Sequence, residues 1–443
     1  MPTPEQRFAR LVGEAQRDGR LPSLTAAVFR AGEVEWSQSI GIADAEAGSE
    51  ATVDTQYAVA SITKTFTATT VMQLRDEGKL DLDDPLERHL PDVAHGGLTL
   101  GRMLAHASGL QREPPGEVWE TLVFPEAEEL LASLPEAEQV LPGATAWHYS
   151  NLAYALLGQV VGRIVGRPFR EHVEERLLRP LGLRRTTWGF DGVHARPYFV
   201  EPYSESVQRE PELDLGGKGG ESGLCSTVED LARWGSFLCD PDESLLAPAT
   251  VEQMHQVRIM AEPDWTLGWG LGIELWRRGD RIFGGHTGGF PGFISMLVYS
   301  RLEKIGAVVL TNSGRWPKAT DTGLRLLEAA LEELAPAPEP WVPEETPPKE
   351  ITPLLGRWWS EGHEFVFSWR GGRLEAQVAT APPERAPSVF EPDGDDRFRT
   401  ISGDERGELL RVLRDEVGHV EKLYWATYPF TRAPVVFGRR SDA

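Results

Sequence analysis

A proline-rich run divides this sequence of 443 residues into two unequal parts. Residues 335–353 read APAPEPWVPEETPPKEITP. Proline fixes φ and lacks a backbone N–H, so a run this dense excludes helices and central strands and is typical of a stiff, extended linker. We therefore predict a large domain over residues 1–335, a linker over 336–353 and a small domain over 354–443.

Segments with the pattern of strands lie near both ends of the large domain. β-Branched and aromatic residues predict strands at 24–30, 34–40, 273–276, 281–284, 292–299 and 306–311. Apolar residues at helical spacing predict helices at 4–18, after Ser61, from Asn151 to Gly166, and at 169–178, 227–238 and 320–334. Strands from both ends with helices between and after them indicate an α/β (α+β) fold, with one antiparallel sheet and an inserted helical region.

The small domain has the pattern of an all-β fold. Short strands are expected at 365–369, 374–378, 409–413, 422–426 and 435–437, separated by turn signals such as Arg370-Gly-Gly. This spacing favours a small barrel or sandwich.

Overall charge and cysteine content exclude several classes of function. The net charge of −23 disfavours binding to nucleic acid or to an anionic membrane surface. The first residues lack a basic stretch followed by an apolar one, and no apolar run approaches the ~18 residues of a membrane helix, so neither a secretory signal nor a membrane span is expected. Cys225 and Cys239 are too few for a disulfide framework, which predicts reduced thiols in a cytoplasmic protein.

Two further patterns point away from cofactors. Residues 216–220 are rich in glycine but lack the spacing of a phosphate-binding loop, so we predict a mobile loop there. No histidine pair has zinc-ligand spacing backed by a carboxylate. The sequence therefore predicts neither a metal nor an organic cofactor.

Ser61 and Lys64 form the first pattern that can carry chemistry. They stand three residues apart at the start of a predicted helix, so the hydroxyl and the amine should be neighbours. A serine becomes a nucleophile only when a base removes its proton, and an amine of lowered pKa can be that base. A capping serine beside a solvated lysine is the ordinary alternative for this pair.

Two other patterns could complete such a site. Tyr149 and Asn151 stand where a loop enters a helix, and a phenol whose pKa is lowered by a neighbouring ammonium can act as a base. The Asn151 amide can bind a substrate carbonyl. His286-Thr287-Gly288-Gly289 lies between predicted strands, and the Gly289 N–H could complete an oxyanion hole with the N–H of Ser61.

Ordinary structural roles for these residues stay open. They are a core phenol for Tyr149, a helix cap for Asn151, and a turn for the His286–Gly289 stretch. For His106 we expect a buried histidine bonded to backbone rather than a site residue.

With its three motifs, the chain resembles the serine β-lactamase and penicillin-binding-protein group, in the class C β-lactamase-like branch. The resemblance covers about residues 5–335 and includes Ser61-Ile-Thr-Lys64, Tyr149-Ser-Asn151 and His286-Thr-Gly288, with similar connecting segments at 98–110 and 220–231. It implies a β-lactamase-like sandwich of an antiparallel sheet and a helical lobe, with a cleft between them. It also implies an acyl-enzyme at Ser61, with Lys64 and Tyr149 sharing the proton transfer. The small domain resembles the lipocalin-like appendage of some members.

These features predict a metal-free serine hydrolase that cleaves a small ester or amide. Class C enzymes that hydrolyse antibiotics usually have lysine at the start of the third motif, where this chain has His286. Because a neutral imidazole holds a substrate carboxylate less well, we predict a carboxylesterase-like preference. The alternatives are a D-amino-acid peptidase or D-Ala-D-Ala carboxypeptidase, or a weak β-lactamase. A catalytically silent binding or scaffold protein is the non-enzymatic alternative. An α/β-hydrolase is excluded because no Gly-x-Ser-x-Gly occurs.

Overall fold

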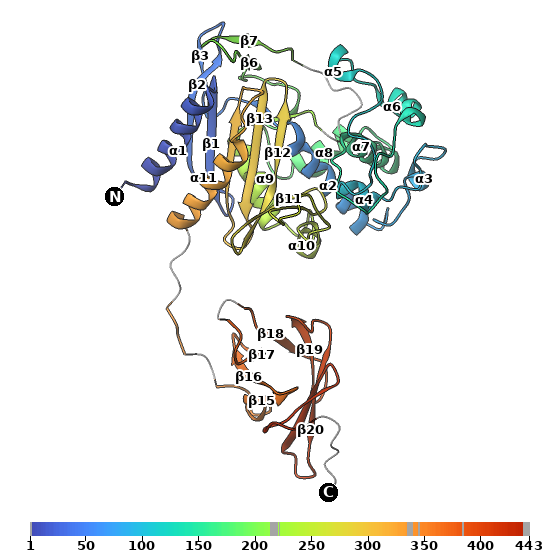
Figure 1. Ribbon diagram of the computed structural model, residues 1–443, viewed down its shortest axis with the longest axis vertical. Helices are drawn as coiled ribbons and strands as arrows, with labels where there is room; N and C mark the ends of the chain where they lie inside the picture. Colours follow the sequence, from blue (N-terminus) through green and yellow to red (C-terminus); the bar gives the residue numbers. More distant parts are fainter. Residues whose placement is uncertain are drawn as a thin grey trace. The chain divides into compact units, whose positions relative to one another are not determined.

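The computed structural model describes residues 2–212, 220, 222–334, 340–343, 346–382 and 385–436. Contacts between residues divide the chain into two compact units, Met1–Pro336 and Ala337–Ala443. Most of the glycine-rich segment 216–220 lies outside the described residues. Figure 1 colours the first unit from blue to orange and the second in orange and red.

A nine-stranded antiparallel sheet organises the first unit (Figure 1), in the order β3-β2-β1-β14-β13-β12-β11-β10-β9. Its strands are β1 (Ser23–Arg30), β2 (Glu33–Asp44), β3 (Ser49–Glu50), β9 (Ile259–Met260), β10 (Leu267–Trp269), β11 (Glu274–Arg278), β12 (Arg281–Phe290), β13 (Phe293–Ser300) and β14 (Ile305–Thr311). Because β1 pairs with both β2 and β14, the two ends of the unit meet at the centre of the sheet. The prediction of one antiparallel sheet built from both ends is confirmed.

Helices cover both faces of this sheet, which explains why β1 is buried from Ser23 to Phe29. Ala26 and Val28 face a cluster shared with α1 (Pro4–Gly19) and α11 (Ala319–Leu334). Ala27 and Phe29 face the opposite cluster, shared with α9 (Val228–Cys239). A strand buried on both faces appears in the sequence as a nearly continuous apolar run. Each fully buried Val, Leu or Phe side chain contributes about 1.5–3 kcal/mol to such a core.

The inserted region forms a helical lobe with two small sheets. The helices are α2 (Thr63–Asp76), α3 (Leu86–His89), α4 (Leu100–Leu104), α5 (Val118–Thr121), α6 (Ala127–Ser133), α7 (Asn151–Val165), α8 (Phe169–Val173) and α10 (Pro248–Met254), with helical turns η1 (Ala60–Ile62), η2 (Leu134–Glu136) and η3 (Glu174–Leu178). The short strands are β4 (Tyr57–Ala58), β5 (Thr187–Trp188), β6 (Tyr198–Val200), β7 (Val207–Arg209) and β8 (Leu224–Ser226). They pair in the order β4-β8-β5 and as β6-β7.

Helix ends in this unit follow local capping chemistry. The side chain of Thr3 caps α1, that of Ser150 caps α7 by accepting from the Ala153 N–H, and that of Thr227 caps α9. Gly166 ends α7 in the left-handed conformation, at φ 68°. The predicted helix from Asn151 to Gly166 is therefore confirmed, whereas Asn151 as its cap is wrong.

The second unit is an eight-stranded antiparallel meander, which confirms a small barrel-like β fold. Its elements are η5 (Thr352–Leu354), β15 (Gly356–Ser360), β16 (His363–Arg370), β17 (Arg373–Val378), β18 (Ser388–Pro392), β19 (Arg397–Ser402), β20 (Leu409–Arg414), β21 (Val420–Trp425) and β22 (Tyr428–Phe430). A bridge between Trp359 and Thr431 brings the first strand to the last and nearly closes the barrel. The predicted strand at 435–437 is wrong for Val435 and Val436, which form no strand, and Phe437 lies outside the described residues.

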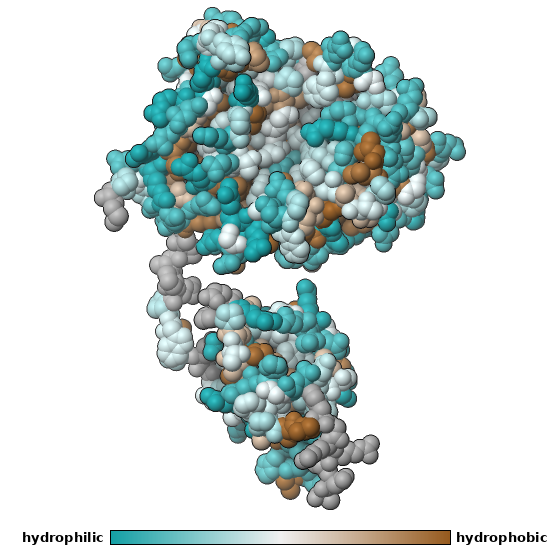
Figure 2. Space-filling model, in the orientation of Figure 1, coloured by the Kyte–Doolittle hydropathy of each residue, from teal (hydrophilic) through white to brown (hydrophobic). Residues whose placement is uncertain are grey.

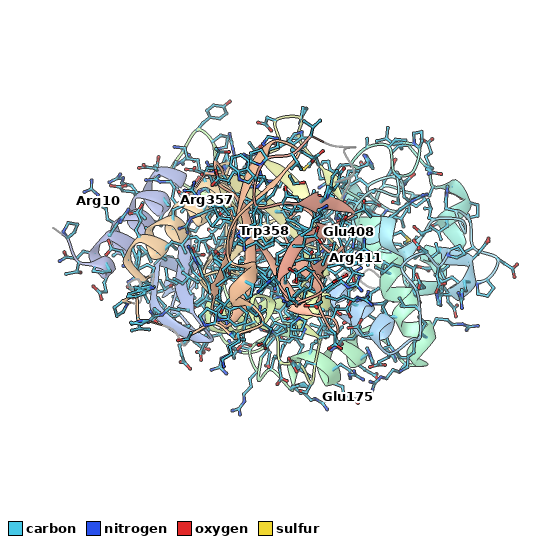
Figure 3. All side chains as sticks on the ribbon, turned by 90° about the horizontal axis from the view of Figure 1, so that it is seen from below. Arg10, Glu175, Arg357, Trp358, Glu408 and Arg411 are labelled. Carbon is cyan, nitrogen blue, oxygen red and sulfur yellow. The ribbon has the colours of Figure 1, made fainter. Side chains whose placement is uncertain are left out.

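Side chains alternate across the barrel wall, as they must in a strand. Trp358, labelled in Figure 3, is fully buried, and the side chain of its neighbour Arg357 is 75% exposed. The guanidinium of Arg432 lies 3.8 Å from the centre of the Trp358 ring and donates to the carbonyls of Leu355 and Arg357. This cation–π contact and its hydrogen bonds cover one side of the barrel core.

The face shown in Figure 2 is mostly hydrophilic, and its apolar residues lie in small, separate patches. Such scattered apolar residues are normal for a globular protein. No helix in the described part of the chain has both the length and the apolar character that crossing a membrane requires.

Candidate active site

Ser61 stands in the turn η1, directly before α2. The turn is attached to two strands: the Val59 N–H donates to the Leu224 carbonyl at 3.0 Å, and the Val59 carbonyl accepts from the Ser295 hydroxyl at 2.9 Å. Ala60 has φ 47°, a left-handed conformation that costs a non-glycine residue free energy. Backbone strain of this kind clusters at functional sites, and here it directly precedes Ser61.

Lys64 lies one turn further along, as the Ser-x-x-Lys spacing predicts. Its Nζ donates to Ser61 Oγ at 3.1 Å. The side chain is fully buried, and Nζ lies 5.1 Å from the ring centre of Tyr149 and 5.6 Å from that of Tyr154. The alternative of a solvated lysine beside a capping serine is wrong.

The helix that carries Lys64 is buried on all sides. Every residue from Thr63 to Leu74 is buried, not only the apolar face that its periodicity predicts. Thr65 and Thr70 donate their hydroxyl protons to the carbonyls of Ile62 and Phe66, and the Thr65 hydroxyl also accepts from the indole of Trp234. The helix therefore holds Lys64 in a rigid, enclosed position.

Tyr149 is the third member of this cluster, and its hydroxyl forms a hydrogen bond with Ser61. Burial raises the pKa of Tyr149 above its ordinary value, and the bond to Ser61 only partly opposes the rise. The expectation of a lowered phenol pKa is wrong, because desolvation outweighs the nearby positive charges. Tyr149 is consequently a neutral phenol at pH 7.

His106 supports Tyr149 from behind. The two rings stack with their centres 4.1 Å apart, and His106 Nδ1 accepts from the Ser150 N–H at 3.0 Å. Burial and the nearby Lys64 hold the pKa of His106 well below 6.5, so the ring is neutral. This confirms a buried histidine bonded to backbone, and it places that histidine directly against the phenol ring of Tyr149.

Asn151 points its amide at a carboxylate that the sequence did not single out. Its Nδ2 donates to Glu113 Oε1 at 2.6 Å, while its Oδ1 is buried without a hydrogen-bond partner. The backbone N–H of Asn151 donates to the Arg112 carbonyl, so the segment carrying Glu113 is attached to the start of α7. One acidic residue in a chain that has 68 carries no signal of its own in the sequence.

The stretch His286–Gly289 lies inside β12, not between strands, so the turn interpretation is wrong. The imidazole of His286 is fully buried, and burial and Lys64 lower its pKa to about 3. Its Nδ1 lies 2.5 Å from the Thr287 carbonyl and 3.4 Å from Glu274 Oε1. His286 therefore supports the site as a neutral ring.

Gly288 is required by close packing. A Cβ at this position would lie 2.3 Å from the Val59 carbonyl oxygen and 2.2 Å from the Ser295 hydroxyl, so only glycine lets η1 lie this close to β12. A Cβ at Gly289 would meet nothing within 4 Å. The Thr287 N–H points away from β13, since it donates to Glu274, and the Gly289 N–H two residues further points the same way.

Glu274 is a second carboxylate that sequence reasoning missed. It is 4% exposed, stands on β11, and accepts from Thr287 Oγ1 at 2.7 Å and from the Thr287 N–H at 3.3 Å. Burial raises the pKa of this carboxyl to about 7, more than these bonds and Lys64 lower it. Only the pairing of β11 with β12 brings it to the motif.

These residues surround one open cavity of about 910 Å³. Ser61, Tyr149, Asn151, Thr287 and Gly289 line it, together with three carboxylates, those of Glu113, Glu262 and Glu274. Lys64, His286 and Gly288 do not line it and lie behind its wall. Within the described residues, no group of three or more His, Cys, Asp or Glu is placed to hold a metal ion. The wall thus offers a hydroxyl nucleophile, backbone donors and three carboxylates.

Known proteins share this arrangement at the level of family and fold. The beta-lactamase family model matches residues 8–331, and a model called domain of unknown function DUF7586 matches 347–432. "Beta-lactamase-like protein 2" of Dictyostelium discoideum is 27% identical over 277 residues, which cover 58% of this chain and 50% of that protein. The chain spans less than two thirds of the length of the first curated relatives it matches.

Two solved structures with the same fold illustrate the similarity, one described as a penicillin-binding protein homologue and one as an amidohydrolase. The octameric penicillin-binding protein homologue from Pyrococcus abyssi is similar at a TM-score of 0.65 and 23% identity, over 96% of this chain and 99% of that one. A D-stereospecific amidohydrolase from Streptomyces sp. is similar at a TM-score of 0.63 and 25% identity, over 75% of this chain and 99% of that one. Since the family model spans most of the chain and the fold agrees with it, this protein belongs to the beta-lactamase family.

Proposed function

We propose that this protein is a metal-free serine hydrolase that cleaves a small ester or amide through an acyl intermediate on Ser61. The observation that carries the proposal is the contact of Ser61 Oγ with both Lys64 Nζ, at 3.1 Å, and the Tyr149 hydroxyl. A serine held between an amine and a phenol, with its hydroxyl at the cavity wall, is equipped for nucleophilic catalysis.

In this mechanism Ser61 Oγ attacks the substrate carbonyl carbon and its proton passes to the Lys64 amine. Tyr149, a neutral phenol, relays a proton to the leaving group as the tetrahedral intermediate collapses to the acyl-serine. A water molecule then attacks the acyl group by the same path in reverse, and Ser61 regains its proton. Assigning the base role to Lys64 is supported by the raised pKa of Tyr149, which leaves little phenolate at pH 7.

Two backbone donors are proposed as the oxyanion hole. The N–H of Ser61 is one donor. The N–H of Gly289 is the other, because it points away from β13 and Gly289 lines the same cavity as Ser61. Thr287 lies on the same edge of β12 and would contact the substrate beside the reacting carbonyl. His286 and Gly288 would act from behind the wall, by packing.

Among substrates, small esters remain our first choice. The neutral ring of His286 offers no permanent charge to a substrate carboxylate, as the sequence led us to expect. A second candidate is an amide with a free amino group, such as a D-amino-acid amide. The Glu113 carboxylate on the cavity wall favours it, as a partner for a substrate ammonium. The Streptomyces protein of similar fold is described as a D-stereospecific amidohydrolase, which agrees with that candidate.

Labelling and turnover together test the proposal. A fluorophosphonate probe is expected to add its mass to the peptide that contains Ser61, and not in the Ser61→Ala variant. A panel of p-nitrophenyl esters of different chain length, nitrocefin and D-amino-acid amides should give turnover that Ser61→Ala lowers by several orders of magnitude, about 10⁴-fold or more. Activity that survives Ser61→Ala would refute the mechanism. Flat traces over the whole panel, with no adduct, would favour a binding or scaffold protein instead.

The expected cytoplasmic location also remains a proposal. Cys225 and Cys239 are both buried and unpaired, and burial raises the pKa of the Cys225 thiol to about 12. Inert, reduced thiols of this kind suit a reducing compartment.

A further inference from the structure

Beside the third motif, the carboxyl group of Glu274 lines the cavity where a substrate would lie. Glu274 is buried, lines the same cavity as Ser61, and holds both the hydroxyl and the N–H of Thr287. Because Thr287 Oγ1 donates its proton to Glu274, only lone pairs of that oxygen are left for a substrate. When Glu274 is ionised, both groups at this part of the wall are therefore acceptors.

Within the described residues, Glu274 forms no ion pair with a lysine or an arginine, and the positive charge of Lys64 lowers its pKa less than burial raises it. His286 is a neutral ring behind the wall, and Lys64 contacts Ser61. The arginines that line the cavity, Arg112, Arg277 and Arg278, are exposed, and solvent screens exposed charges. A buried carboxylate acts in a lower dielectric, so its repulsion of a nearby anion is stronger.

We propose that Glu274 is a specificity-determining residue, which rejects substrates with a carboxylate close to the scissile bond and admits those that are neutral or cationic there. Thr287 and Gly289 are two residues apart on one strand edge, about 7 Å. A substrate carboxylate within that distance of the reacting carbonyl would meet Glu274 and the lone pairs of Thr287. The inference rests on the proposed hydrolase function, and it disfavours carboxypeptidase and β-lactamase activity for a reason independent of His286.

Matched ester pairs test this inference without depending on the natural substrate. One pair is phenyl butyrate and 3-carboxyphenyl butyrate, with the charge on the leaving group. The other is phenyl 3-phenylpropanoate and phenyl 3-(3-carboxyphenyl)propanoate, with the charge on the acyl group. The readout is the ratio of kcat/KM for the neutral ester to that for the anionic ester, since effects common to both esters cancel in the ratio. We expect Glu274→Gln, which keeps an acceptor for Thr287 but loses the charge, to lower this ratio about tenfold at pH 8 in at least one pair.

Glu262 provides a matched control. It is another carboxylate on the cavity wall, it accepts from the Thr266 hydroxyl at 2.6 Å, and it is exposed. Glu262→Gln makes the same chemical change at an exposed site, and the ratio should stay within about twofold of that of the wild type. An equal effect of both substitutions would reduce the inference to general charge repulsion and overturn it.

The pH dependence of the wild type gives a second, independent readout. The groups that face Glu274 are Thr287 and His286 on β12, Lys64 on α2, and Tyr149 in the loop before α7. Because burial raises the pKa of Glu274 to about 7, its charge appears between pH 6 and 8. The neutral-to-anionic ratio should rise several-fold over that interval in the wild type and stay flat in Glu274→Gln. If Glu274→Gln does not fold, the wild-type profile decides, and a flat profile overturns the inference.

Failure of the proposed function would look different. If the wild type hydrolyses none of the four esters, the hydrolase proposal loses support. Calorimetric affinities for 3-hydroxybenzoate and 3-hydroxybenzamide would still test whether Glu274 repels an anion in the cavity. Weaker binding of the benzoate to the wild type, restored in Glu274→Gln, would support the inference. If the wild type hydrolyses the neutral esters and its ratios equal those of Glu274→Gln at pH 8 in both pairs, Glu274 does not set specificity.

Discussion

Replacing Gly288 by alanine should move the nucleophile without touching it. The added Cβ would lie 2.3 Å from the Val59 carbonyl oxygen and 2.2 Å from the Ser295 hydroxyl. Since a carbon and an oxygen approach no closer than about 3.3 Å, the turn that carries Ser61 would have to move by about 1 Å. A misplacement of that size costs about 100-fold in rate.

The same substitution should also lower stability. Overpacking a buried site costs about 1–3 kcal/mol, and separating Val59 from Ser295 loses a buried hydrogen bond worth about 1 kcal/mol. We therefore expect Gly288→Ala to lower the free energy of unfolding by about 2–4 kcal/mol in urea titrations. The rate of Ser61 labelling by a fluorophosphonate and the kcat/KM for a p-nitrophenyl ester should fall together.

Gly289→Ala is the matched control, because a Cβ there meets nothing within 4 Å and the proposed oxyanion N–H is kept. We expect it to change the labelling rate by less than about threefold, well below the ~100-fold effect at Gly288. If folded Gly288→Ala is labelled as fast as Gly289→Ala, the argument that Gly288 sets the position of Ser61 is refuted.

Four other predictions follow from the site and from the division of the chain. Tyr149→Phe keeps the stack on His106 but loses the hydroxyl at Ser61, so kcat/KM for an ester should fall about 100- to 10,000-fold with little change in the urea midpoint; equal rates would remove Tyr149 from the mechanism. The pKa of His286 is lowered from 6.5 to about 3, so between these pH values the unfolded state binds more protons than the folded state. The free energy of unfolding should therefore fall as the pH drops from 6.5 towards 3. The pKa of Glu274 is raised from 4.5 to about 7, so this group stabilises the folded state at low pH and loses that contribution as the pH rises to 7. From pH 5 to 8, the free energy of unfolding of the wild type should therefore fall relative to that of Glu274→Gln. Parallel curves of the two proteins would contradict this. Limited proteolysis should cut within 335–353, where Trp341 is 84% exposed, and leave a folded fragment 1–335; an insoluble fragment would show that the two units fold together.

The sequence was sufficient for the architecture because burial left a strong pattern. The apolar run of β1 and its counterparts β13 and β14 predicted a central sheet built from both ends. The pattern failed at β12, whose Gly284-Gly285 and Gly288-Gly289 pairs have the composition of turns. Pairing with β13 outweighs the weak strand propensity of glycine at these positions. In the barrel, β15, β18, β19 and β22 were not predicted; they are only three to six residues long, and Pro392 at the end of β18 disfavours a strand in the sequence.

Site residues were predictable only where a spacing identified them. The three-residue spacing from Ser61 to Lys64 is local, so the structure brings the two side chains together as the pattern implies. Glu113 and Glu274 reach the cavity through tertiary contacts, with Asn151 and across β11 and β12, and no local pattern marks them. The direction of the Tyr149 pKa shift depends on how much water burial removes, which the order of residues does not state.

The meeting of the two ends at the centre of the sheet has a consequence for synthesis of the chain. The Ser23 N–H donates to Asn312, which is 289 positions later, so the middle of the sheet cannot close until the ribosome has released nearly the whole first unit. At about 5–20 residues per second, the β1–β2 hairpin waits about 15–60 seconds for β14. During that time β1 exposes an unpaired apolar edge, which is the kind of surface that chaperones bind and that aggregates through edge pairing. Slow, non-local closure of this sort predicts that expression yield depends more on translation speed and chaperone supply than on the stability of the finished fold.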